Sequence, residues 1–272
     1  MENKIVLKKR NIFTCLLFAC VCFGLFAADV DMDDAKKVLK LVESNTAFYE
    51  TDFSGEYTIV QDKPGEGKSI TEAKLFRRDK TLQWTILITG PASEKGKGYL
   101  QADGNIWFYD PTDHRFTYSK AKDKFQNTNA KTSDFTPQFY DRDYSIESVT
   151  SVKLGKLDCY LYDLKAKVND VDYPELKIWV SKNDGLLRMK EDYSLSGQKL
   201  RTTAIPSYQV INQSGKTYSI PVKMLIQDNL RGRKIGDTVQ YEKTQVTIAN
   251  VKFEKVEDTV YTKPYLEMGA AR

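Results

Sequence analysis

The chain has 272 residues, of which 41% are hydrophobic and 12% aromatic, and its formal net charge is +4. Four basic residues stand within the first ten positions against a single glutamate, so the rest of the chain is close to neutral. Proteins that bind nucleic acid usually concentrate basic residues on one surface. The near-neutral remainder therefore argues against nucleic acid as a partner.

The N-terminus has the pattern of a secretory signal peptide, which we assign to residues 1–27. The basic residues precede an uncharged apolar run over 12–26, too short to span a bilayer comfortably. Small residues at its end predict cleavage after Ala27, which would leave residues 28–272 as one periplasmic domain. Two alternatives stay open: lipidation at Cys20, which would anchor the chain, or a retained membrane anchor.

Cysteine usage excludes an internal disulfide in the exported chain. Three of the four cysteines lie inside the signal, which leaves only Cys159. A chain of this length can bury enough apolar surface to be stable without a cross-link. Cys159 lies in an alternating pattern, so we expect a buried thiol that acts as a small hydrophobic residue.

The predicted elements begin with one amphipathic helix from Asp31 to Tyr49, with acidic residues at its cap and apolar residues on one face. From there the hydrophobic pattern changes to a period of two, for example over 82–88, 160–166 and 176–180. Asp-Gly, Pro-Gly and Ser-Gly turn signals separate these runs. Successive short strands with tight turns pair antiparallel. The sequence therefore predicts a large meandering sheet.

One segment, from Asn127 to Tyr144, breaks this alternation. It is polar and contains Phe135, Phe139 and Tyr140, and we interpret it as a loop with a short helix that crosses the sheet. In a closed sandwich the many aromatic residues would only fill the core. A strongly curved sheet has a concave face that one helix and a short crossing segment do not easily fill. Such a face would suit a pocket for acyl chains.

Several signals of catalysis are missing. His114 is the only histidine and follows a turn, which argues against a histidine-based triad and a zinc site. The loops at 65–68 and 95–98 have the composition of a phosphate loop but not its spacing. We therefore predict that the protein is not an enzyme and needs no cofactor or metal.

A basic loop follows Asn229 and contains Arg231, Arg233 and Lys234. It could touch an anionic membrane surface or a partner, or it could be a solvated hairpin tip. The sequence does not choose between these interpretations.

Two segments carry a resemblance to a known family. Residues 76–84 read Phe-Arg-Arg-Asp-Lys-Thr-Leu-Gln-Trp, and residues 103–111 read Asp-Gly-Asn-Ile-Trp-Phe-Tyr-Asp-Pro. Together they resemble the periplasmic lipoprotein carriers of the LolA type. The length and the strand at 173–180 resemble the larger LolA-like outer-membrane lipoprotein-sorting proteins, and the resemblance covers nearly all of the exported chain.

The resemblance implies a mainly β (α+β) fold class: an incomplete, half-open antiparallel β-barrel with an N-terminal helix and a short helical lid over a hydrophobic cavity. It implies a carrier that binds acyl chains of lipoproteins or lipids and shuttles them toward the outer membrane. Its partners would be an inner-membrane transporter and an outer-membrane acceptor, with transient membrane contact by a monomer. The alternative is a lipid-binding or sensor module that serves a lipid exporter.

The resemblance also implies a latch for the lid. In LolA-type carriers a strand-end arginine before a tryptophan holds the lid closed through hydrogen bonds to lid backbone. By spacing, six residues before Trp84, that arginine is Arg78. The family usually has proline next, whereas Asp79 stands here and could pair with the guanidinium. Arg78 could instead be a solvated charge beside Arg77.

Candidates for the cavity wall are apolar and aromatic residues on the expected strands. Residues 107–109 are consecutive, so they cannot all face the cavity, and the sequence does not decide which of them do. The candidates are Trp84, Ile86, Leu100, Trp107, Tyr109, Phe116, Ile178, Met189, Met224 and Ile226.

Overall fold

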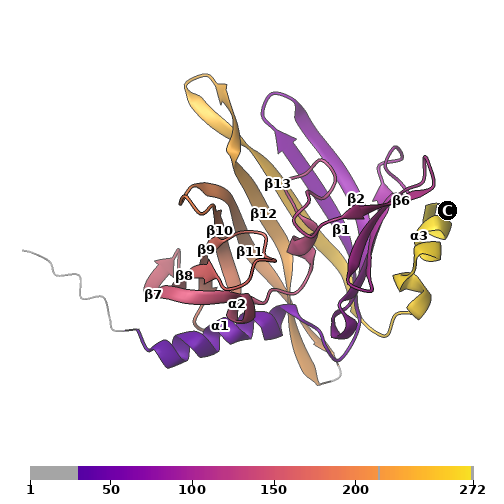
Figure 1. Ribbon diagram of the computed structural model, residues 1–272. Coiled ribbons are helices and arrows are strands. Elements are labelled where there is room, and N and C mark those ends of the chain that lie inside the picture. The colour runs from indigo at the N-terminus through magenta and orange to yellow at the C-terminus, as the bar shows by residue number, and fades with distance from the viewer. Residues whose placement is uncertain (1–29, 214, 271–272) are drawn as a thin grey trace, which may run out of the picture.

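The computed structural model describes residues 30–213 and 215–270. The expected signal peptide, its cleavage site and Cys20 lie outside these residues. Thirteen strands form one antiparallel sheet that curves around α1 (Met32–Thr46) and around a crossing segment (Figure 1). This is the open antiparallel β-barrel with helices that the sequence predicts.

The sheet is a meander that returns to its starting strand. Its first part consists of β1 (Phe53–Lys63), β2 (Gly67–Arg78), β3 (Gln83–Gly90), β4 (Gly98–Ala102), β5 (Asn105–Asp110) and β6 (Arg115–Ser119). Its second part consists of β7 (Tyr144–Leu154), β8 (Leu157–Ala166), β9 (Glu175–Ser181), β10 (Leu187–Tyr193), β11 (Lys199–Gln213), β12 (Lys216–Ile235) and β13 (Thr238–Phe253). Consecutive strands pair within each part, and β1 pairs with β13, so the two edge strands are β6 and β7.

The alternating pattern gives the sheet an inner face, which packs against α1 and the crossing segment, and an outer face. Trp84, Ile86 and Ile88 of β3 belong to the inner core, whereas Leu87 packs into a second, smaller cluster on the outer face. Side chains of a strand point alternately to the two faces. The inner core contains most of the buried aromatic residues of the described chain.

Helix α1 starts and ends where local chemistry dictates. The carboxylate of Asp31 accepts hydrogen bonds from the backbone N–H groups of Asp33 and Asp34, at 3.0 and 3.1 Å, and so caps the first turn. The helix ends at Thr46 and not at Tyr49, because Phe48 turns into the inner core. There its ring meets the Phe253 ring edge-on, with centroids 5.0 Å apart.

The crossing segment, residues 120–143, is called the lid below. It joins β6 to β7 and contains a short 3-10 helix, η2 (Thr132–Phe135), and α2 (Tyr140–Asp143). Phe125 and Phe135 are buried in the inner core, 5.4 Å apart between ring centroids. The Asn129 backbone N–H donates to Thr244 Oγ1 at 2.8 Å and to Gln61 Oε1 at 3.2 Å. These hydrogen bonds attach the lid to β1 and β13 on the inner face of the sheet.

The C-terminal segment covers the outer face, which the sequence analysis did not anticipate. A 3-10 helix, η3 (Asp258–Tyr261), and α3 (Lys263–Ala270) lie beside β2, β3 and β4 (Figure 1). Leu266 is fully buried and packs against Leu100 and Tyr109. None of the helices within the described residues is long and apolar enough to cross a bilayer.

Candidate functional site

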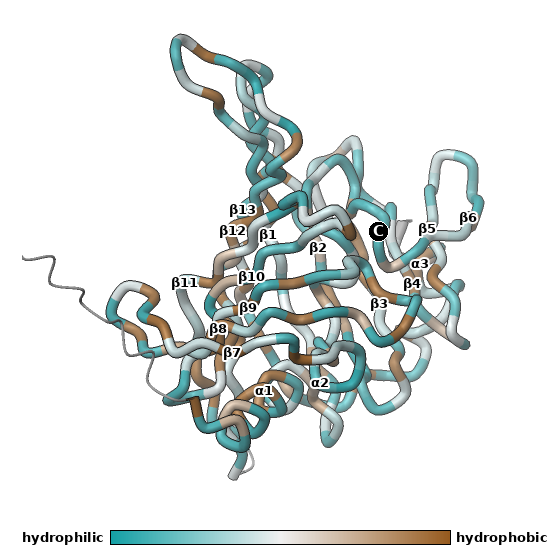
Figure 2. The backbone as a smooth tube through the Cα atoms, turned by 60° about the vertical axis from the view of Figure 1, so that its left-hand side comes forward, coloured by the Kyte–Doolittle hydropathy of each residue, from teal (hydrophilic) through white to brown (hydrophobic). Residues whose placement is uncertain are grey.

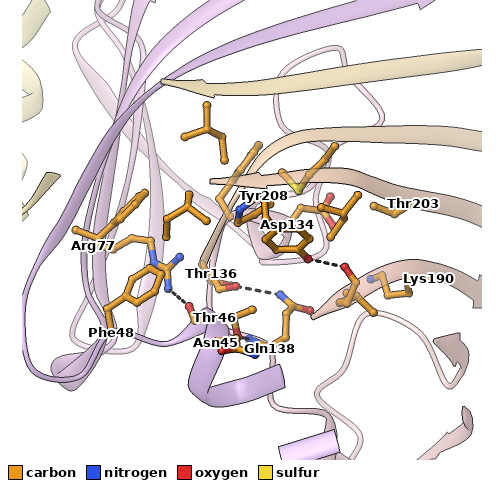
Figure 3. A pocket seen from close by; sticks show the side chains of 18 of the residues that line it. Asn45, Thr46, Phe48, Arg77, Asp134, Thr136, Gln138, Lys190, Thr203 and Tyr208 are labelled. Atoms are coloured by element: carbon orange, nitrogen blue, oxygen red, sulfur yellow. Dashed lines mark hydrogen bonds between the residues drawn. The ribbon is translucent and has the colours of Figure 1, made fainter. Parts of the chain in front are cut away.

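A cavity of about 80 Å³ lies between the lid, the end of α1 and the inner face (Figure 3). Pockets that bind small molecules usually measure about 300–1,000 Å³, so this cavity is too small for a ligand while the lid covers the sheet. The concave face is therefore not left open as expected, because Phe125 and Phe135 of the lid occupy much of it. The wall consists of Asn45, Thr46, Phe48, Phe53, Tyr57, Arg77, Asp134, Phe135, Thr136, Gln138, Tyr140, Leu187, Lys190, Thr203, Ile205, Tyr208, Ile220, Pro221, Met224 and Ile248.

Most of this wall is apolar and comes from the middle of the sheet. Tyr57, Ile220, Met224 and Ile248 are buried on β1, β12 and β13. On the lid side, Phe135 meets the Tyr57 ring edge-on at 5.5 Å between centroids. Because the lid contributes apolar side chains to the same cluster, displacing it would expose an apolar surface on the sheet.

Arg77 is the arginine that faces this cavity. Its guanidinium donates to Asp79 Oδ1 at 3.0 Å and to the Thr46 carbonyl at 2.8 Å, at the end of α1. It also lies over the Phe48 ring, 5.0 Å from the centroid. Arg77 pairs with Trp84 in the register of β2 and β3, and directly opposite residues share a face. The arginine on the face of Trp84 is thus Arg77.

Arg78 lies on the outer face instead, one residue further along the strand. Its guanidinium donates to Asp52 at 2.8 Å, to Asp258 at 2.6 Å and to the Val256 carbonyl at 2.6 Å, and lies 4.6 Å from the centroid of the Tyr261 ring. Hydrogen bonds to Asp52 raise its pKa further above the ordinary range. The assignment of Arg78 by spacing therefore requires correction, because alternation sends its side chain away from the lid.

The cavity has a polar end on β10 and β11. Lys190 and Thr203 both line it and lie directly opposite each other in the strand register. The next inward pair on the same strands, Asp192 and Arg201, is also opposite in register. Arg201 Nε donates to Asp192 Oδ2 at 2.7 Å, deep in the molecule. Four polar side chains therefore interrupt the apolar inner face at this point.

The lid supplies the countercharge that completes this group. Asp134 accepts two hydrogen bonds from Arg201, at 2.7 and 2.8 Å, and one from the Lys131 backbone N–H at 2.8 Å. Burial alone would raise the pKa of Asp134, but the charge and hydrogen bonds of Arg201 lower it below its usual range. The same carboxylates raise the pKa of Arg201 despite its burial. This buried ion-pair group holds the lid against the sheet.

The wall candidates from the sequence divide between the two faces. Met224 lines the cavity, and Trp84, Ile86, Ile178 and Ile226 are buried in the inner core without lining it. The remaining candidates point outward, by strand alternation and by their contacts with the C-terminal segment, so they do not line this cavity: Leu100, Trp107, Tyr109, Phe116 and Met189.

The outer positions have a simple physical origin. Leu100 and Tyr109 pack with Phe116 around Leu266, and the Lys263 ammonium lies 3.5 Å from the centroid of the Trp107 ring. The helix α3 thus buries aromatic and apolar side chains that would otherwise face water. Of the three consecutive residues that the sequence left open, Phe108 packs on the inner core and its two neighbours face outward.

The histidine and the cysteine of the described residues lie apart from the cavity. No group of histidine, cysteine and acidic residues there is arranged to hold a metal ion. His114 Nδ1 lies 3.3 Å from the Tyr109 hydroxyl at a turn. Cys159 is fully buried, and this burial raises the pKa of its thiol.

The basic loop forms the tip of a long hairpin of β12 and β13 that extends beyond the rest of the sheet (Figure 2). Arg231, Arg233 and Lys234 are exposed there. Three large apolar side chains of the same hairpin are exposed as well: Leu230, Ile235 and Val239. The tip therefore presents basic and apolar groups together.

Sequence reasoning missed the polar end of the cavity. Lys190 and Asp192 stand two residues apart in a strand, at positions whose neighbours on β9 and β11 are buried. Charged residues at inward positions of a strand predict a buried ion pair, because such groups are rarely buried without a partner. Their partner Asp134, however, comes from a segment whose place over the sheet could not be derived.

Comparison with known proteins places the sequence in a family. A family model described as "Uncharacterized protein" matches residues 80–268. The chain belongs to this family. No curated protein matches the sequence.

Solved structures identify the fold. A LolA superfamily protein from Nitrosomonas europaea superposes with a TM-score of 0.68 at 19% identity, covering 85% of this chain and 98% of that one. A domain assigned to the outer membrane lipoprotein-sorting proteins of Vibrio parahaemolyticus gives 0.69 at 13% identity, with coverage of 85% and 97%. A DUF1329 family protein from Desulfovibrio piger gives 0.70 at 15% identity, with coverage of 86% and 98%. The chain therefore has the LolA-like fold, which confirms the resemblance at that level.

Proposed function

We propose that this LolA-like protein is a periplasmic carrier, which takes up the acyl chains of a lipoprotein or lipid between its lid and the inner face of its sheet. The observation that carries the proposal is an apolar sheet surface covered by a lid whose own phenylalanines complete the cluster. Acyl chains could take the place of the lid side chains there and keep the apolar surface of the sheet covered. The expected export signal supplies the periplasmic location.

Retention of cargo would follow from burial alone. Each methylene removed from water contributes about 0.8 kcal/mol, so chains of ordinary length are held tightly without polar contacts. Release into water would re-expose the same surface. The carrier therefore needs a loading transporter in the inner membrane and an acceptor at the outer membrane, and it functions without catalytic chemistry.

Opening requires the lid to leave the sheet, and the polar contacts of the lid contribute to the free energy that this movement requires. These contacts include the Arg201–Asp134 pair, the hydrogen bonds of Asn129 and the link from Gln138 to Thr46. Further polar contacts join the lid residues Lys124, Gln126, Lys131 and Ser133 to the rest of the protein. Arg77 holds the Thr46 carbonyl from the other side. We assign the latch role to Arg77, because it contacts the end of α1 beside the lid.

The β12–β13 hairpin is the proposed site of transient membrane contact. Exposed basic side chains are attracted to anionic lipid surfaces, and exposed apolar neighbours add to binding at the interface. Leu230 and Arg231 stand next to each other at this tip. A contact of this size would be reversible, as a shuttle requires.

The function is tested by purifying the full-length protein from the envelope fraction of its own cells, followed by native mass spectrometry and lipid extraction. We expect co-purifying acylated species. Bound acylated protein would identify a lipoprotein-sorting carrier, and bound free lipid would identify a module that works with a lipid exporter. A protein that carries neither, and that also fails to bind a fluorescent fatty acid, would refute the carrier function.

A further inference from the structure

The polar end of the cavity carries an inference about the ligand, which rests on the proposed function because the acyl chain would occupy the same space. Lys190 and Thr203 lie opposite each other on β10 and β11 and both line the cavity (Figure 3). Side chains directly opposite in an antiparallel pair have Cβ atoms about 4.5–5.5 Å apart. An ammonium and a hydroxyl are therefore neighbours at the edge of an apolar space.

Both groups are buried with bonding capacity to spare. Lys190 is 9% exposed and Thr203 is 5% exposed. Thr203 Oγ1 has no hydrogen-bond partner among the described residues. The Lys190 ammonium forms an ion pair with Asp192, 3.1 Å from its Oδ1, and no other carboxylate pairs with it among the described residues. A lysine ammonium carries three donors, so donors are left over.

The other charges nearby have partners of their own. Arg201 binds both oxygens of Asp134 and Asp192 Oδ2. Burial alone would lower the pKa of Lys190, but the charge of Asp192 raises it above the usual value, so the ammonium is protonated at neutral pH. Lys190 is thus the buried cation beside the cavity with the fewest bonds.

Buried polar groups in folded proteins are nearly always hydrogen-bonded, and exceptions point to a missing ligand or water. We propose that Lys190 and Thr203 bind the head of an anionic amphiphile, with a carboxylate or phosphate oxygen accepting hydrogen bonds from both. The acyl chain then runs from Thr203 past Ile205 along the apolar wall toward Ile220 and Met224. The cargo class is an anionic lipid in preference to a neutral one.

The experiment is isothermal titration of the purified exported chain with dodecanoate and with methyl dodecanoate, which share one chain and differ in head charge. Charge-assisted hydrogen bonds predict that dodecanoate binds roughly ten- to hundred-fold more tightly. Lys190→Met should abolish this preference, so that dodecanoate and its ester bind with similar affinity. Thr203→Val should reduce it, and because that hydroxyl has no partner, the variant should fold normally.

A matched control is Lys177→Met, on the neighbouring strand. Lys177 lies one residue from the inward Ile178, so its side chain points outward, where it pairs with Asp163 at 3.1 Å. This variant should keep the full preference. Inorganic phosphate, which has the charge but no chain, should not displace dodecanoate at equal concentration.

The outcomes separate the two proposals. If neither dodecanoate nor its ester binds, the carrier function fails and takes this inference with it. If both bind equally, the cavity accepts acyl chains but the anionic-head assignment is overturned. A preference that survives in both Lys190→Met and Thr203→Val also overturns it, as does displacement by inorganic phosphate.

Discussion

Arg201 on the sheet holds Asp134 of the lid through two hydrogen bonds, of 2.7 and 2.8 Å, and both side chains are buried. The same guanidinium reaches Asp192 on the neighbouring strand. Such a group contributes little net stability when intact, because both charges lose their water. Removal of one partner destabilises the fold, however, because the other charge stays buried without it. The group therefore favours one specific position of the lid on the sheet.

Breaking this closure should therefore destabilise the closed form. Asp134→Ala leaves Arg201 buried with one carboxylate in place of two, and removal of one partner from a buried ion pair typically costs about 3–5 kcal/mol. We expect a lower free energy of unfolding in urea and faster amide exchange over residues 121–135. The control is Asp158→Ala, in an exposed pair with Lys153, which should cost about 0–1 kcal/mol. Equal effects of the two substitutions would contradict the assignment.

The same pair predicts acid sensitivity. The pKa of Asp134 is lowered in the folded protein, so the folded state binds fewer protons than the unfolded chain, where the value is about 3.9. This contribution to stability is fully present above about pH 4 and is lost as the pH falls through the folded pKa. The difference in unfolding free energy between wild type and Asp134→Asn should be constant from about pH 5 to 7 and shrink below about pH 4. A difference that grows on acidification would refute this account.

Adjacent arginines should behave differently in cargo uptake. Arg77→Lys retains a charge beside Asp79 but loses the planar donor set that also reaches the Thr46 carbonyl. If Arg77 is the latch, this hydrogen bond exists only in the closed form, and its loss, about 1 kcal/mol, should raise the apparent affinity for a fluorescent fatty acid about five-fold. Arg78→Lys alters only contacts with Asp52 and the C-terminal segment on the outer face. If Arg78→Lys alone changes uptake, the latch lies at that position after all.

The C-terminal helix should matter for stability and not for cargo. A Cβ on Gly98 would lie 2.5 Å from Leu266 Cδ2 and 2.7 Å from the Ile86 carbonyl oxygen, so Gly98→Ala must push α3 away from β4. Leu266→Ala should cost about 2–5 kcal/mol, measured by thermal or urea unfolding. Leu195→Ala, at an exposed position, should change stability by less than about 0.5 kcal/mol. Fatty-acid affinity should stay unchanged in all three folded variants.

Local patterns in the sequence were enough to predict strands, turns, the first helix and the crossing segment. Alternation also shows which residues share a face, for example Trp84 with Ile86. Alternation does not say which face is the inner one, because that depends on the pairing register of the strands. Leu100 pairs with Thr85 and not with Trp84, so it lies on the face opposite to Trp84. A shift of the register by one residue would exchange the faces. The apolar side of α3 then determined that Leu100 and Tyr109 lie outside.

The site was harder to predict because its parts are distant in the chain. The spacing of Arg78 to Trp84 placed the latch one residue away from Arg77, and one residue in a strand means the opposite face. The inward charges of Lys190 and Asp192 were visible in the sequence. Their meaning depended on Arg201 and Asp134, which only the folded chain brings beside them.

The pairing of β1 with β13 makes β6 and β7 the two outermost strands, although they follow each other in the chain. Residues 120–143 therefore form a strap that bridges the open side of the sheet from β6 to β7 and is attached at both ends. A strap of this kind cannot swing free like a flap with one hinge. Its length limits how far β6 and β7 can separate. In a carrier, the length of this segment would therefore set the width of the acyl cargo that fits, and the tethered segment would return to the same position after release.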